Sequence, residues 1–96
     1  MVPLPKPEPF TPADARKLIR EILAVGEVQF SGHANKEMAD DQLQTTDCLN
    51  VLRGGVVQPP DFEKGTWRYR VVTARICVVV AFPSATRLKV VTVWRI

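Results

Sequence analysis

The feature that most constrains this chain is a change in the spacing of its apolar residues at Val56. Before Val56, apolar residues recur every three or four positions, as they do on one face of a helix. After Val56, they alternate or form β-branched runs that are typical of strands, above all in "RICVVVAFP". A chain with helices first and consecutive strands afterwards favours the α+β class, with helices packed on one face of an antiparallel sheet.

Each predicted helix begins at a capping signal. Thr11 is a candidate N-cap with Pro12 at the first helical position, and Ser31 is a candidate N-cap for the next helix. Glycines at position 26 and in the pair 54–55 mark helix ends. The three helices are predicted between Thr11 and Gly26, between Ser31 and about Asp40, and from Thr45 or Thr46 to Arg53.

The second half of the chain predicts hairpin-linked strands. Period-two patterns lie in "VVQP", "GTWRYRVVT", "RICVVVAFP" and "RLKVVTVWRI", and "EVQF" before Ser31 is a further short candidate. We expect a curved sheet of three to four antiparallel strands, covered by two to three helices. In the last strand, alternation predicts Lys89, Val91, Val93 and Arg95 on one face, opposite the face of Leu88 and Val90.

The first ten residues form a separate segment because prolines occupy positions 3, 5, 7 and 9. Alternate prolines cannot continue a helix and favour an extended, polyproline-like conformation. We therefore divide the chain into an extended Pro-rich arm, residues 1–10, and a single α+β domain, residues 11–96. A length of 96 residues is enough for one hydrophobic core.

Composition narrows the classes of partner and site. The net charge of +3 suits an RNA, DNA or acidic-protein partner, although many proteins without such partners are equally basic. Cys48 and Cys77 lie in apolar surroundings without a metal-ligand pattern, which predicts buried free thiols and no metal. No signal peptide or bilayer-length apolar run is visible. We expect a cytoplasmic protein with no membrane association and no cofactor.

His33 is the single histidine and the first candidate for chemistry. With Ser31 as N-cap, His33 falls in the first turn of its helix, where the positive end of the helix dipole favours the neutral imidazole. A neutral imidazole can act as a general base. The alternative is a structural histidine whose ring nitrogens bond backbone groups at the helix start, and His33 taken alone favours that alternative.

Basic residues of the predicted sheet are the second candidate. Alternation puts Arg68 and Arg70 on one face of their strand, and Lys89 and Arg95 on one face of theirs. Guanidinium groups bind phosphate in a bidentate manner, and aromatic rings such as that of Tyr69 stack on unpaired bases. The alternative is a solvated face, since a sheet covered on one side must be polar on the other.

Several short motifs together resemble the DUF4258 family. They are F-S-x-H-A-x-x-x-M, a helix ending in "VLRGG", and then "WRYRV", "ICVVVAF" and "VVTVWR", which span roughly Phe30 to Arg95. That family is similar to the RelE-like and MqsR-like bacterial toxins, which place helices against a curved antiparallel sheet. The resemblance therefore implies a RelE-like fold and a toxin-like protein that cleaves RNA and is paired with an antitoxin protein.

The resemblance also implies positions for the family's residues, with two departures. The family usually has arginine just before the methionine and again three residues after it, where this chain has Glu37 and Asp41. Either the arginines' phosphate-binding part is lost, or it has moved to the sheet. The family's motif positions correspond here to Ser31, His33, Ala34, Met38, Gly54 or Gly55, and Tyr69.

Two functional hypotheses follow. In the first, the protein is a metal-independent endoribonuclease acting on mRNA or ribosome-associated RNA, with His33 as base or acid, Tyr69 as its partner or a stacking platform, and Arg70 on the phosphate. Arg68, Arg75, Lys89 and Arg95 supply further phosphate contacts. In the second, the same fold is a non-catalytic module that binds a protein or nucleic acid through its sheet edge or basic face. The sequence leaves a homodimer open.

Overall fold

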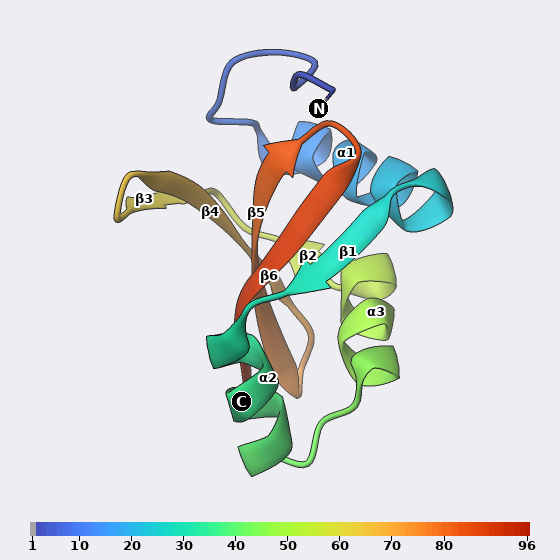
Figure 1. Ribbon diagram of the computed structural model, residues 1–96, viewed down its shortest axis with the longest axis vertical. Helices are drawn as coiled ribbons and strands as arrows, with labels where there is room; N and C mark the ends of the chain where they lie inside the picture. The colour runs from blue at the N-terminus through green and yellow to red at the C-terminus, as the bar shows by residue number, and fades with distance from the viewer. Residues whose placement is uncertain (1) are drawn as a thin grey trace.

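The computed structural model describes residues 2–96, so Met1, the first residue of the predicted arm, lies outside the described residues. The chain forms three helices and six strands within that range (Figure 1). The elements are α1 (Pro12–Val25), β1 (Glu27–Phe30), α2 (Gly32–Asp40), α3 (Thr45–Gly54), β2 (Val56–Val57), β3 (Asp61–Glu63), β4 (Thr66–Val72), β5 (Ile76–Ser84) and β6 (Arg87–Arg95).

The predicted helices are confirmed, and their capping residues act as expected. The Thr11 hydroxyl accepts a hydrogen bond from the backbone of Asp14 at 3.2 Å, which caps α1. The Ser31 hydroxyl caps α2 by accepting the backbone N–H of Ala34 at 2.9 Å. Short-range capping rules therefore set the start of both helices.

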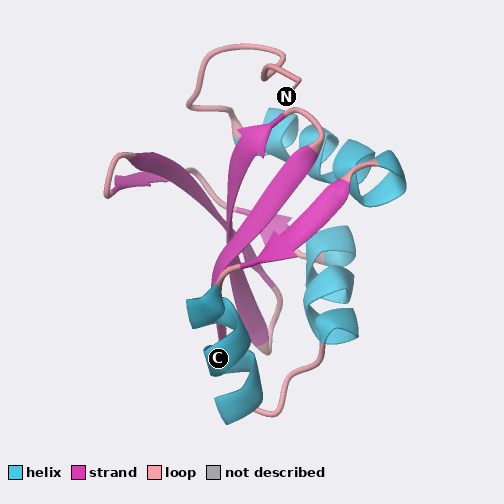
Figure 2. Cartoon of the chain, viewed as in Figure 1, coloured by secondary structure: helices cyan, strands magenta, loops and turns pink. Residues whose placement is uncertain are grey.

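The sheet differs from the prediction in number and direction of strands. Its order is β1-β6-β5-β4-β2, with β3 paired to β4, and β1 runs parallel to β6 (Figure 2). The prediction of three to four purely antiparallel strands is therefore wrong, and the fold is α+β with a six-stranded mixed sheet. The short "EVQF" segment forms the parallel strand β1. Its partner β6 lies some sixty residues further along the chain, which leaves room for the crossover connection that a parallel pair requires.

A β-bulge at Val91 changes which residues of β6 face the core. Val80 pairs with Val90 while Val79 pairs with Thr92, so Val91 has no partner on β5. Beyond this extra residue the alternation is inverted, and Val93 is fully buried. The prediction that Lys89 and Val93 share a face is therefore wrong, because a period-two pattern assumes a regular ladder.

Helices α1 and α3 cover one face of the sheet, and α2 lies along β6 at its end (Figure 1). The core forms where the helices meet the sheet, and α1 contributes Leu18, Ile19 and Ile22 to it. Alternate residues of the central strands, including Val78 and Val80, point into the same core. The other face of the sheet carries the opposite set of side chains and is not covered by α1 or α3.

The Pro-rich arm ends in the core. Residues 2–10 contain neither helix nor strand, but Phe10 is only 3% exposed. Its ring lies 5.9 Å from that of Tyr69 and 5.7 Å from that of Phe82, measured between centroids. The arm is thus held to the domain by an aromatic cluster.

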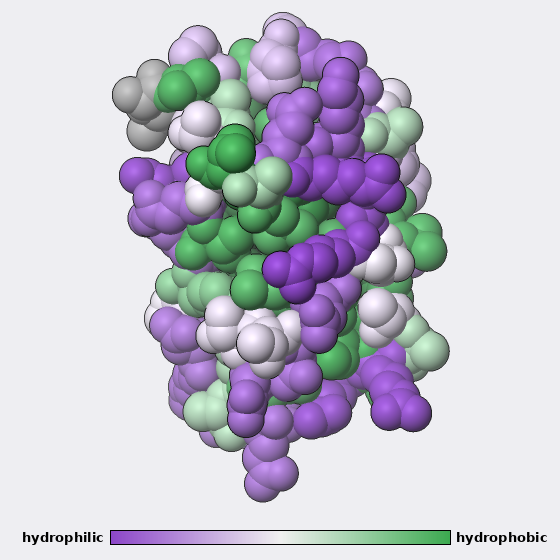
Figure 3. Space-filling model, turned by 90° about the vertical axis from the view of Figure 1, so that its right-hand side faces the viewer, coloured by the Kyte–Doolittle hydropathy of each residue, from purple (hydrophilic) through white to green (hydrophobic). Residues whose placement is uncertain are grey.

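The side of the molecule that carries β1 and the ends of α1 and α3 shows apolar surface between hydrophilic bands (Figure 3). Partly buried apolar residues on these elements include Leu23, Val28 and Leu49. Both cysteines are buried free thiols, as predicted. Within residues 2–96, no helix is long and apolar enough to cross a bilayer.

Candidate functional site

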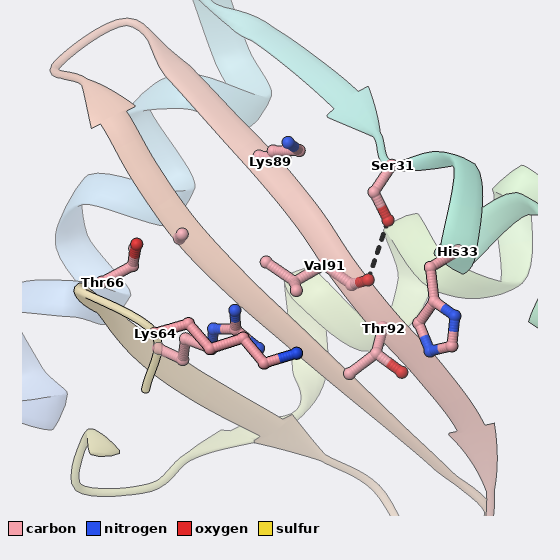
Figure 4. A pocket seen from close by; sticks show the side chains of 9 residues that line it. Ser31, His33, Lys64, Thr66, Lys89, Val91 and Thr92 are labelled. Atoms are coloured by element: carbon pink, nitrogen blue, oxygen red, sulfur yellow. Dashed lines mark hydrogen bonds between the residues drawn. The ribbon is translucent and has the colours of Figure 1, made fainter. Parts of the chain in front are cut away.

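A cavity of about 440 Å³ lies on the face of the sheet that α1 and α3 leave uncovered. We call it the groove. Figure 4 shows Lys64 on one side of the groove and His33 on the other, with residues of β6 between them. The groove is lined by Ser31, His33, Lys64, Thr66, Arg68, Ala81, Lys89, Val91 and Thr92.

Strand register sets the spacing of two cations across the groove. Ala81 on β5 pairs with Lys89 on β6, and Arg68 occupies the neighbouring position on β4. Arg68 and Lys89 therefore flank a small residue at a backbone separation of two strand spacings, roughly 10 Å. Long cationic side chains at this separation can both reach one anion above Ala81.

Ser31 positions the start of α2 over the groove. Besides capping α2, its hydroxyl donates a hydrogen bond to the carbonyl of Val91 at 2.8 Å (Figure 4). The backbone N–H of Ser31 also donates to the carbonyl of Val90 at 3.0 Å. Because Val91 is the bulge residue, the irregular part of β6 is the part that holds the first turn of α2.

His33 projects from that first turn into the groove and is largely exposed. Its side chain is 69% exposed, and its Nε2 lies 3.3 Å from a carboxylate oxygen of Glu37, one helical turn further on. Glu37 therefore lies beside Nε2, and Nδ1 is the other ring nitrogen that can act on a ligand. An exposed imidazole beside a carboxylate can act as a general base.

Glu37 also ties α2 to β6. Its carboxylate accepts hydrogen bonds from the hydroxyl of Thr92 and, at 3.2 Å, from the backbone N–H of Val93. The same oxygen that faces His33 is therefore fixed by the strand that forms the floor of the groove. One carboxylate thus links His33, α2 and β6.

Lys64 reaches the groove from a tight hairpin that the sequence analysis did not predict. Glu63 pairs with Thr66, so β3 and β4 are joined by a two-residue turn formed by Lys64 and Gly65. Both have positive φ, 50° and 78°, as a type I′ turn requires. Gly65 after Lys64, between two segments with strand-like alternation, is the local signal that could have predicted this turn.

A second cavity, of about 120 Å³, adjoins the groove. We call it the Trp94 pocket. It shares the lining residues Arg68 and Thr92 with the groove, so the two cavities are neighbours. Two ion pairs cross it, Arg68 with Glu63 at 3.4 Å and Arg70 with Asp61 at 3.8 Å. The pocket is lined by Asp61, Glu63, Arg68, Arg70, Val79, Thr92 and Trp94.

Arg68 stands at the junction of the two cavities with an unsatisfied donor. Among the described residues, its Nε is the one buried side-chain nitrogen or oxygen without a hydrogen-bond partner. A buried donor left without an acceptor costs about 1–3 kcal/mol. An anionic ligand in the groove could supply an acceptor for this donor.

Tyr69, predicted to assist His33, lies on the opposite face of the sheet. It is fully buried, its hydroxyl donates to a carboxylate oxygen of Glu8 at 2.8 Å, and it accepts the backbone N–H of Phe10 at 2.9 Å. Burial raises the pKa of Tyr69, and burial likewise raises the pKa of Glu8. The structure therefore places Tyr69 at the anchor of the arm and apart from the groove.

The other predicted cations divide between the groove and distant positions. Arg68 and Lys89 line the groove and Arg70 lines the Trp94 pocket. Arg95 instead bonds the end of α2, where its Nε donates to the carbonyl of Asp41 at 2.8 Å. Arg75 lies in the β4–β5 turn and lines a different cavity, next to α3. Lys89 and Arg95 therefore do not share a face, contrary to the sequence prediction.

Nothing in residues 2–96 gathers three or more histidine, cysteine or carboxylate side chains into a metal-binding cluster. Comparison with curated proteins finds no match, and comparison with solved structures finds none either. A family model described as "Domain of unknown function (DUF4258)" matches residues 30–95. The match covers well over half of the 96 residues and runs from just before the His33 helix to the end of β6. On this match the chain belongs to the DUF4258 family.

Proposed function

We propose that the groove binds the phosphodiester backbone of single-stranded RNA and cleaves it with side chains alone. The observation that carries this proposal is the position of His33. Its imidazole is exposed, oriented by Glu37, and lies in one cavity with the cations Lys64, Arg68 and Lys89. A base beside several cations is what cleavage of RNA by its own 2′-hydroxyl requires.

The reaction uses each of these groups once. Nδ1 of His33 takes the proton of a ribose 2′-hydroxyl, whose oxygen then attacks the adjacent phosphorus. Lys89 and Arg68 stabilise the extra negative charge on the phosphoryl oxygens in the transition state. The bond from phosphorus to the 5′-oxygen breaks, which leaves a 2′,3′-cyclic phosphate on one fragment and a 5′-hydroxyl on the other.

Lys64 is the candidate donor of the proton that the departing 5′-oxygen needs. Its ammonium group extends across the groove from the β3–β4 turn, toward the strand residues in front of His33 (Figure 4). This assignment replaces Tyr69, whose buried hydroxyl is engaged with the arm. Base and acid then approach the phosphate from opposite sides of the groove.

A transcript-cleavage assay tests the proposal. We expect His33→Ala to reduce the cleavage rate on the order of 10²–10⁴-fold, the usual contribution of a general base. Lys89→Gln should reduce cleavage as well, and activity should persist with a chelator present. Lys17→Gln is the matched control, because Lys17 is an exposed lysine on α1 outside both cavities. Equal cleavage by wild type and His33→Ala would exclude the role of His33.

The physiological setting that we propose is a toxin paired with an antitoxin protein. Expression of the wild type should arrest growth, whereas His33→Ala should be harmless. The arrest should be relieved by a protein encoded next to this chain. Arrest by both proteins would show that toxicity does not depend on cleavage by His33.

A non-catalytic interaction module is the second candidate, favoured by the free edge of β1. Glu27 and Ser31 direct their backbone N–H groups to β6, so those of Val28 and Phe30 point to the outer edge. Within residues 2–96 no strand pairs there. A partner's strand could add to this edge. Tight partner binding together with absent cleavage by the purified wild type would favour this candidate.

A further inference from the structure

The Trp94 pocket differs in chemistry from the groove that it adjoins. Lys64 and Lys89 give the groove an excess of positive charge, whereas Asp61 and Glu63 bring two carboxylates to the pocket. An aromatic side chain, Trp94, lines the pocket and is absent from the groove lining. A ligand that fits both cavities would place an anionic group in the groove. In the pocket it would place a flat group with hydrogen-bond donors, beside Trp94 and the two carboxylates.

We infer that the Trp94 pocket binds an unpaired nucleobase of the RNA and prefers guanine. This inference rests on the proposed function, because it assumes that the groove holds the phosphate. It goes beyond that function by assigning a base preference and the residues that produce it.

Stacking is the first reason. Trp94 is half-buried on β6, two residues beyond Thr92, and Arg70 is exposed on β4. Arg70 pairs with Val79, and Val79 pairs with Thr92, so Val79 forms an apolar floor between the strands of Arg70 and Trp94. Unpaired bases stack on aromatic rings, and Trp94 supplies one in this pocket. Arg70, on the neighbouring side of the pocket, then remains available to bond the edge of the base.

The hydrogen-bonding edge is the second reason. Asp61 lies 3.8 Å from Arg70, too far for a hydrogen bond between them, and both side chains remain about half exposed, at 55% and 46%. Guanine presents two neighbouring donors, N1–H and the N2 amino group, which a single carboxylate can accept together. It also presents O6 and N7, the acceptors that arginine binds in a bidentate manner. Asp61 beside Arg70 thus matches both the donors and the acceptors of guanine.

Other bases match the pocket less well. Adenine and cytosine each present one amino group as donor, and uracil presents one N–H between two carbonyl oxygens that a carboxylate repels. The lining residues that the pocket shares with the groove, Arg68 and Thr92, place the base close to the phosphate that would be cleaved. The expected preference is therefore for guanine at a nucleotide adjoining the cleaved bond.

Binding of non-cleavable oligonucleotides tests this inference apart from catalysis. We would measure fluorescence anisotropy of the full chain with labelled 2′-O-methyl pentanucleotides of uracil, carrying guanine, adenine, cytosine or uracil at the centre. The guanine probe should bind about tenfold more tightly than the all-uracil probe, in line with the discrimination of a bidentate contact. Trp94→Leu should weaken binding of all four probes about tenfold, because the stacking surface is lost.

Asp61→Asn and Glu63→Gln form the matched pair of variants. Both remove one carboxylate from β3, but only Asp61 faces Arg70. We expect Asp61→Asn to abolish the guanine preference and Glu63→Gln to keep it. Equal affinity of wild type for all four probes overturns the base subsite and leaves the proposed function standing. If no probe binds, the proposed function falls together with this inference.

Discussion

At the scale of single residues, the acids Glu37 and Asp41 both stabilise contacts between α2 and β6. Glu37 accepts hydrogen bonds from Thr92 and Val93 and lies 3.3 Å from His33. Asp41 offers its backbone carbonyl to Arg95. Both carboxylates accept hydrogen bonds from backbone N–H groups of β6, that of Glu37 from Val93 and that of Asp41 from Arg95. The positive charge at the groove comes from the sheet and from the β3–β4 turn.

Tyr69→Phe separates a structural from a catalytic role for the tyrosine. Removal of the hydroxyl leaves the buried N–H of Phe10 without its acceptor and Glu8 without its donor. We expect the free energy of unfolding to fall by about 1–3 kcal/mol in urea titration. The rate of RNA cleavage, measured well below the unfolding transition, should stay unchanged. A lost cleavage activity at undiminished stability would restore Tyr69 to the catalytic machinery.

The position of Tyr69 could have been predicted from the sequence. Strict alternation along "WRYRV" puts Tyr69 and Arg70 on opposite faces of their strand. The same pattern that predicts the strand therefore argues against a shared catalytic role for these neighbours. Which of the two faces is covered by helices is a long-range property, and period two alone does not reveal it.

At the scale of elements, the bulge in β6 predicts that two valines of this strand contribute differently to stability. Val91 and Val93 would share a face in a regular strand, so that Val→Ala would cost the same free energy at both. In the structure Val93 is fully buried, whereas Val91 is the half-exposed bulge residue. We expect Val93→Ala to lower the free energy of unfolding by about 2 kcal/mol, and Val91→Ala by a small fraction of that.

Chemical denaturation of the two variants side by side measures the difference. The substitution is identical and the positions are two residues apart, so strand propensity contributes equally to both. Equal losses of stability would contradict the bulge and support a regular β6.

Elements that depend on local signals could be predicted, and those that depend on distant partners could not. Thr11 and Ser31 cap their helices through residues three positions away, which a sequence displays directly. The parallel pairing of β1 with β6 and the bulge at Val91 arise only when distant segments meet. The site follows the same division. Local sequence predicts that His33 lies at a helix start, but its proximity to Lys64, Arg68 and Lys89 depends on how distant segments pack.

At the scale of the whole molecule, the two faces of the sheet differ in what they carry. One face, under α1 and α3, holds the apolar core and, through Phe10 and Tyr69, the Pro-rich arm. The other face holds the groove and the Trp94 pocket. Because alternate residues of the same strands serve both faces, the core and the face that carries the two cavities are built from one set of strands.

This arrangement predicts how RNA binding depends on salt. The net charge of +3 is modest, but the groove concentrates the cations Lys64, Arg68 and Lys89. A ligand that neutralises about three phosphates on single-stranded RNA should give a slope of about −2 in a plot of log K against log salt. Fluorescence anisotropy with a 2′-O-methyl oligonucleotide between low and physiological salt measures this slope.

Variants show whether that slope belongs to the groove or to the protein's overall charge. Lys89→Gln removes one phosphate contact, so the slope should become less steep by about 0.7. Lys17→Gln changes the net charge equally but lies on α1, outside both cavities, and should leave the slope unchanged. If both variants change the slope by the same amount, RNA binding depends on the overall charge of the molecule, and the groove is not a specific phosphate-binding site.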